Sequence, residues 1–258
     1  MMKMFAVMGR DVKACLNAFS FYLTALFFLG VAGYFFWSDV CYFSLVSFQA
    51  ATNPAAQVDH LNLTEGVFSP FLLNVGVLLL LLVPILTMRS FAEERKMGTL
   101  ELLFTYPVSN LEILAGKFLA VMALLFILVL PTASYFPLAG ATGAKFELSS
   151  MVSGYLGLLF LGASFTALGI FLSSLTDNQA VSAGIGFVFL LFFWIAGWIA
   201  DWSNPALGNI FRELSLVEHF RDFTRGVMDT KDIAYFVLFV VFFLFAALSS
   251  IENRTWKR

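Results

Sequence analysis

The stretch RSFAEERKMGTLELLFTYPVSNLEILAGK, residues 89–117, is a charged, helix-forming block that lies between two long apolar segments without charged residues. Uncharged apolar runs of about 20 residues are long enough to cross the hydrocarbon of a bilayer. The stretch therefore predicts a membrane protein that presents a short structured element in the cytosol. We look for function in that element.

The composition of the whole chain supports this class of protein. Hydrophobic residues make up 60% of the chain and charged residues 12%, and the mean hydropathy is +0.87. A soluble domain of this size could not bury so much apolar surface. The predicted fold is an all-α polytopic membrane protein with six transmembrane helices, near residues 19–38, 71–88, 118–140, 151–175, 180–200 and 233–251.

None of these six runs contains Asp, Glu, Lys, Arg or His between its ends. Proton-coupled and ion-coupled carriers place ionisable groups at membrane depth, so the sequence argues against that class of transporter. The two histidines, His60 and His219, both fall in predicted outer loops, where we expect plain surface residues. The sequence has no H-E-x-x-H motif and no paired intramembrane carboxylates, so we predict no catalytic residue and no metal site.

Basic residues near the ends of the runs predict the orientation, because cytosolic loops carry more Lys and Arg than outer loops. With the N-terminus inside, the outer pieces hold Lys145 and, in a longer loop where acids outnumber them, Arg212, Arg221, Arg225 and Lys231. Both termini are thus predicted to be cytosolic. The inner pieces then hold Lys3, Arg10, Lys13, Arg89, Arg95, Lys96, Lys117, Arg254, Lys257 and Arg258.

The segments outside the six runs also carry structural signals. Residues 1–18 form a predicted interfacial amphipathic helix, because their apolar side chains recur at helical intervals. Residues 40–69 are predicted as an outer segment without Lys or Arg. In residues 201–232, Pro205 follows a capping residue and residues 215–218 (SLVE) form a capping box, so we predict two short outer helices.

The inner block itself predicts a short helix across the membrane surface. Residues 90–93 (SFAE) form a capping box that would begin a helix at about Phe91, Gly98 weakens it, and Pro107 stops it. Residues 109–112 (SNLE) form a second box that begins the third span, and residues 176–179 (TDNQ) form a third between spans four and five. The alternative is an ordinary solvated loop. A loop that only links two spans needs fewer residues and no leucines, so we favour a protein-docking element.

Several runs of residues resemble the permease subunit of ABC-2 type transporters, most closely its gliding-motility-type branch. The branch in turn resembles the permeases of nitrous oxide reductase copper-site maturation. The resemblance covers most of the chain, and the first outer loop matches least. The matching runs are residues 84–94 (PILTMRSFAEE), 98–103 (GTLELL), Pro107, 116–118 (GKF), 154–157 (GYLG), 171–179 (FLSSLTDNQ) and 225–229 (RGVMD).

The resemblance implies a single ABC-2 type transmembrane domain over residues 1–258, with a coupling helix in residues 89–117 that docks on a separate ATPase subunit. It implies an elbow helix in residues 1–18 and outer re-entrant helices in residues 201–232. The residues that would inherit the docking role are Glu93, Glu94, Gly98, Thr99 and Glu101.

The same resemblance implies a bacterial cytoplasmic (inner) membrane location and a complex of two permeases with two ATPases. The resemblance implies an accessory membrane protein with an extracytoplasmic domain as a further partner. It does not imply a nucleic-acid partner. The chain lacks the G-x-x-x-x-G-K-[ST] phosphate loop, so we expect no cofactor here and ATP on the partner subunit. The uncharged spans suggest an amphipathic or large substrate, exported by family analogy. The alternative is a membrane anchor or sensor that docks a cytosolic partner without transport.

Overall fold

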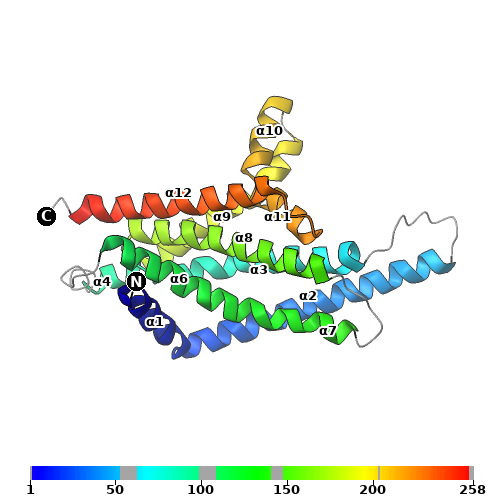
Figure 1. The fold of residues 1–258 in the computed structure, drawn as a ribbon, viewed down its shortest axis with the longest axis horizontal. Helices are drawn as coiled ribbons and strands as arrows, with labels where there is room; N and C mark the ends of the chain where they lie inside the picture. The colour runs from blue at the N-terminus through cyan, green and yellow to red at the C-terminus, as the bar shows by residue number, and fades with distance from the viewer. Residues whose placement is uncertain (1, 53–62, 99–108, 141–147, 203, 256–258) are drawn as a thin grey trace.

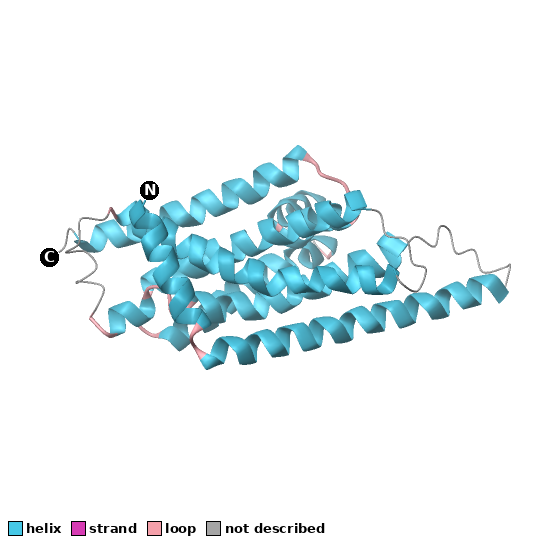
Figure 2. Cartoon of the chain, turned by 60° about the horizontal axis from the view of Figure 1, so that its bottom comes forward, coloured by secondary structure: helices cyan, strands magenta, loops and turns pink. Residues whose placement is uncertain are grey.

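A computed structural model describes residues 2–52, 63–98, 109–140, 148–202 and 204–255 of the chain. The described part is helical, with no strand in it (Figure 2). Six helices are long and apolar enough to cross a membrane, which confirms the predicted number of spans. They are α2 (Phe19–Thr52), α3 (Ser69–Thr87), α6 (Asn110–Val129), α8 (Leu148–Leu175), α9 (Gln179–Asp201) and α12 (Thr230–Thr255).

Shorter elements join the spans. The N-terminal α1 (Met2–Leu16) precedes α2, η1 (Thr64–Phe68) leads into α3, and α4 (Ala92–Lys96) follows α3. After α6 the chain continues through η2 (Leu130–Ser134), a 3₁₀ turn at Pro131, into α7 (Tyr135–Gly140). Proline removes a backbone donor and so favours such a break. Between α9 and α12 lie α10 (Pro205–Leu214) and α11 (Leu216–Thr224).

The fourth span, α8, is the centre of the bundle, and it contacts α3, α6, α9, α11 and α12. Small residues allow these close approaches. A Cβ atom at Gly157 would collide with Phe223 of α11, and one at Gly169 would collide with Thr87 of α3. The side chain of Phe165 is fully buried in the resulting core.

The first span is longer than the sequence predicts. We expected a span at residues 19–38 and a loop from residue 40, but α2 continues to Thr52. Its 34 residues make a rod of about 51 Å at about 1.5 Å per residue, against about 30 Å of hydrocarbon. Residues 39–52 contain neither proline nor glycine, so nothing ends the helix at the membrane boundary. The far end of α2 projects past the neighbouring helices (Figure 1).

The two short helices before the last span are present as predicted. Asn204 precedes Pro205 at the start of α10, and the Glu218 amide donates to Ser215 Oγ at the start of α11 (3.5 Å). The two helices differ in burial, because α10 projects from the bundle while α11 packs into it (Figure 1). Whether they re-enter the membrane stays a prediction.

The prediction of a surface position for His219 is wrong. Its side chain is 5% exposed, because α11 turns one face into the bundle. Nδ1 lies 2.6 Å from Oδ1 of Asp232, and Nε2 lies 3.1 Å from the carbonyl oxygen of Glu213. The ring stacks on Tyr235 with 4.0 Å between centroids. The other histidine, His60, lies outside the described residues.

Candidate functional site

The short helix α4 lies at the same end of the bundle as α1 and both chain termini (Figure 1), and we call this the α4 end. It forms where the charged block was predicted to form a helix. Its five residues make less than two turns of helix, too few to be stable without tertiary contacts. The contacts that hold α4 in place therefore define the site.

The first of these contacts is a cap that comes from another span. We predicted that residues 90–93 would cap the helix, but the capping residue, Phe91, makes no side-chain cap hydrogen bond. Instead the backbone N–H groups of Phe91 and Ala92 donate to Ser173 Oγ of α8, at 3.1 and 3.2 Å. The same hydroxyl donates to the carbonyl oxygen of Met88 (3.2 Å). Ser173 thus joins the end of α3 and the start of α4 to α8.

Replacing Ser173 with alanine is expected to release α4 from α8. Two buried N–H groups would lose their acceptor, and such a loss destabilises a structure by about 1–3 kcal/mol. The measurement is limited proteolysis with trypsin at Arg95 and Lys96, which should become faster as α4 opens. Ser174→Ala is the control, because that hydroxyl only donates back to Phe171 O of its own helix (2.6 Å). Equal cleavage rates in the two variants would contradict the role of Ser173.

Glycine ends α4 at its other terminus. Gly98 follows the C-cap residue Met97 and has a φ of 69°, in the left-handed region that glycine adopts without strain. We predicted that Gly98 would only weaken the helix, whereas it terminates it. Thr99 and Glu101, the next two residues of the predicted docking set, lie outside the described residues.

An ionic cluster of Arg10, Asp11, Glu94 and Lys117, the α1–α4–α6 cluster, binds α4 to two other helices. Glu94 Oε1 accepts hydrogen bonds from Arg10 Nη2 of α1 at 2.8 Å and lies 2.9 Å from Lys117 Nζ of α6. Lys117 Nζ also lies 3.5 Å from Asp11 Oδ2 of α1. The Lys117 side chain is only 3% exposed, and its ammonium sits over the ring of Phe91, 5.0 Å from the centroid.

The crossing of α1 over α6 places these charges together. A Cβ atom at Gly116 would lie 2.9 Å from the carbonyl oxygen of Met4, so only glycine permits this close approach. Sequence reasoning placed Lys117 on the inner side, in a run that resembles the family and at the end of the coupling region, but it gave Lys117, Arg10 and Asp11 no role of their own at the site. One signal was present: a lysine that follows a glycine at the start of an apolar span must find a buried partner.

A second ionic contact fastens α4 to the turn between α8 and α9. Arg95 Nη2 donates to the carbonyl oxygen of Ser174 (2.6 Å), and Nη1 lies 3.0 Å from Asp177 Oδ1. The capping box predicted for this turn is wrong. The cap is Asn178, whose Oδ1 accepts from the Ala180 amide (3.0 Å), because α9 begins two residues later than the box requires.

The predicted docking residues therefore divide into two groups. Glu94 points into the α1–α4–α6 cluster, with 17% of its side chain exposed. Gly98 is exposed together with Lys96 and Met97, and Glu93 is half-buried without an ion pair among the described residues. The surface that α4 offers to a partner is thus formed by Glu93, Lys96, Met97 and Gly98, which we call the α4 surface.

Comparison with known proteins identifies the family. No curated protein matches the chain. The sequence model of the family described as "ABC-2 family transporter protein" matches residues 23–220. The matched part contains α4, Lys117 and the α8–α9 turn, and it begins after α1. The match covers well over half of the chain, and six helices of the structure can cross a membrane. The chain is therefore a multi-pass membrane protein that belongs to the ABC-2 transporter family.

Proposed function

We propose that the chain is the membrane-spanning permease subunit of an ATP-driven ABC-2 type transporter in the bacterial cytoplasmic membrane. A separate ATPase subunit supplies the energy, and the substrate is an amphipathic or large molecule that moves outward. Family membership supports the need for a partner ATPase. The observation that carries the proposal is that α4, a five-residue helix, is fastened to α1, α6 and α8 while one of its faces stays accessible.

We infer that the ATPase docks on the α4 surface. Glu93 and Gly98 keep the docking role that the resemblance implies, and Lys96 and Met97 join them because they are exposed. Thr99 and Glu101 follow directly along the chain and stay in the predicted docking set. Glu94 has a different role in this proposal. It is a positioning residue that holds α4 against Arg10 and Lys117.

The contacts of α4 suggest how motion would pass into the membrane. Displacement of α4 pulls α6 and α1 through the α1–α4–α6 cluster, and it pulls α8 through Ser173 and Arg95. Because α8 contacts four other spans and α11, it distributes that displacement across the bundle. Rigid-body motion of packed helices is a common way to switch a transporter between states. Both termini are placed in the cytosol by this proposal, on the side of the ATPase.

The proposed complex holds two permease copies and two ATPases, with an accessory membrane protein that has an extracytoplasmic domain as a further partner. In α2, only 17% of the most apolar stretch is buried inside the chain. This span therefore leaves ample surface for a second copy. The proposal also places the α4 end in the cytosol. It assigns the chain to the gliding-motility-type branch of the family.

The proposal is tested by purifying the tagged chain gently from its native membrane and measuring what accompanies it. One ATP-binding subunit per permease, in a complex with two of each, is the expected result. A chain that arrives alone or with a protein that binds no ATP would contradict the proposal. That outcome would favour an anchor or sensor that docks a partner without transport.

A charge reversal at Glu93 separates docking from folding. Glu93→Lys is expected to weaken ATPase binding on the order of 10- to 100-fold, or about 1.4–2.7 kcal/mol, because an unfavourable charge at an interface opposes association. Thermal stability should stay unchanged, since no described residue forms an ion pair with Glu93. Glu94→Lys is the contrasting variant, because it places a third cation beside Arg10 and Lys117 and should unfold more easily. Full ATPase binding by Glu93→Lys would exclude docking at this face.

A further inference from the structure

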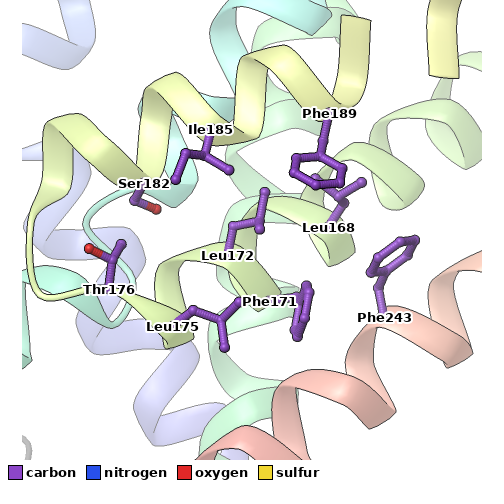
Figure 3. A pocket seen from close by; sticks show the side chains of 9 residues that line it. All are labelled: Leu168, Phe171, Leu172, Leu175, Thr176, Ser182, Ile185, Phe189 and Phe243. Carbon is purple, nitrogen blue, oxygen red and sulfur yellow. The ribbon is translucent and has the colours of Figure 1, made fainter. Parts of the chain in front are cut away.

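An apolar pocket opens between three spans at the α4 end. Its floor is the last two turns of α8, including Leu172, and its walls come from α9 and from α12 (Figure 3). Ile185 and Phe189 of α9 face Phe243 of α12 across it. The pocket has a volume of about 270 Å³, and we call it the α8–α9–α12 pocket. Its lining is almost wholly apolar.

Aromatic rings close the pocket toward the middle of the bundle, and its depth is less than the thickness of one leaflet. The ring of Phe193 of α9 lies 5.2 Å from that of Phe239 and 6.4 Å from that of Phe243, centroid to centroid, so aromatic rings join α9 to α12 at that level. Along α8 the lining runs from Leu168 to Leu175. Seven helical steps correspond to a depth of about 10 Å, against about 15 Å for half of the hydrocarbon.

The open end of the pocket is polar and carries a positive charge. Thr176 lines both the pocket and an adjoining recess of about 390 Å³, which is also lined by Lys96, Asp177 and Asn178. Asp177 is already paired with Arg95 (3.0 Å). Lys96 is exposed, and no carboxylate in the described part of the chain pairs with it. The apolar pocket therefore opens beside the ammonium group of Lys96 at the turn between α8 and α9.

We propose that the α8–α9–α12 pocket binds one acyl chain of an anionic phospholipid from the leaflet at the α4 end, with the lipid phosphate beside Lys96 and Thr176. Acyl chains surround the spans at this depth, and basic residues at a membrane surface attract anionic headgroups. The bound headgroup would lie against the turn to which Arg95 fastens α4. Lys96 also belongs to the α4 surface, so the lipid site is tested on the chain without the ATPase, where its outcome does not depend on ATPase docking.

The test uses the full chain in vesicles of phosphatidylcholine and phosphatidylglycerol. A phosphatidylglycerol analogue with a photoreactive group on its acyl chain is compared with the matching phosphatidylcholine analogue, and labelled peptides are mapped by mass spectrometry. We expect labels to concentrate on the lining residues of α8, α9 and α12, with phosphatidylglycerol preferred. Lys96→Gln should lower that preference about fivefold. Lys13→Gln, at an exposed lysine of α1, should leave it unchanged.

Variants that fill the pocket test its position. Leu172→Trp from the floor and Ile185→Trp from the wall should each abolish labelling of the pocket, so that one variant serves if the other fails to fold. Val188→Trp is the control, since Val188 is exposed on α9 but does not line the pocket. Equal labelling by the two lipids, or labels spread evenly over all spans, would mean bulk lipid only and would overturn the proposal. An Ile185→Cys crosslink between two chains would overturn it too, because a second copy would then cover the pocket.

Discussion

Lys117→Met is expected to destabilise the protein by about 3 kcal/mol, because it removes the buried cation of an ion pair and leaves Glu94 with Arg10 as its cation among the residues of the cluster. Lys117 is 2% exposed, and its ammonium lies 2.9 Å from Glu94 and 3.5 Å from Asp11. Methionine keeps the length and most of the apolar contacts of the lysine side chain, so the loss reports the charge. Thermal unfolding of the purified chain in detergent measures the effect.

A second substitution separates the charge from the packing. Lys117→Met combined with Glu94→Gln removes both members of the pair, and replacement of a whole buried pair is often nearly neutral. The double variant should therefore regain much of the lost stability, and a double-mutant cycle gives the coupling. Asp11 is 25% exposed, so water can still reach its carboxylate. If the double variant is as unstable as Lys117→Met alone, the pair does not hold α4 in place.

Asp232→Leu, at the other end of the bundle, is expected to destabilise the protein by about 3–5 kcal/mol. Asp232 and His219 are each 5% exposed and lie 2.6 Å apart. The carbonyl oxygen of Glu213 can only accept, so Nε2 of His219 carries a hydrogen. Removal of the carboxylate leaves Nδ1 buried without its partner, and it frees α11 from the first turn of α12. Thermal unfolding and protease cleavage within α11 both measure the result.

The conservative variant Asp232→Asn gives the matched comparison. The amide group of asparagine can either accept a hydrogen bond from Nδ1–H or donate one to a bare Nδ1, so this variant should lose less than half as much stability as Asp232→Leu. Tyr235 also holds this region, because its hydroxyl donates to the carbonyl oxygen of Leu214 (2.8 Å) and its ring supports that of His219. Equal losses in Asp232→Asn and Asp232→Leu would show that charge, rather than the hydrogen bond, is what the site requires.

The number of spans could be predicted because membrane helices need long uncharged apolar runs, which are easy to recognise in a sequence. The length of α2 did not follow, since hydropathy marks where a chain can be in lipid and not where its helix stops. Asp39 ended the apolar run at the predicted boundary, yet in the structure it continues α2, with Asn74 Nδ2 of α3 3.4 Å from its carboxylate.

The sequence predicted a short helix in the charged block, and α4 lies there, but most of the contacts that hold α4 were not predicted. The box at residues 109–112 was confirmed, because the Ser109 hydroxyl and the Glu112 carboxylate cap one another within four residues. The cap of α4 was missed, because its acceptor, Ser173, lies 82 residues further along the chain than Phe91. The inward direction of Glu94 was missed for the same reason. A sequence pattern over a few residues can predict hydrogen bonds within those residues. Partners from other spans depend on how the helices pack.

The central position of α8 has a consequence for how the chain is made. Residues enter the membrane in order, so α3 and α6 are inserted well before α8 leaves the ribosome. Both are more than half buried in the finished protein, and α8 contacts each of them. Until α8 arrives, these helices lack a main packing partner, and α4 lacks the serine that holds its first turn. Biosynthesis thus passes through an intermediate of three inserted spans that insertion factors or lipid must protect until the fourth arrives.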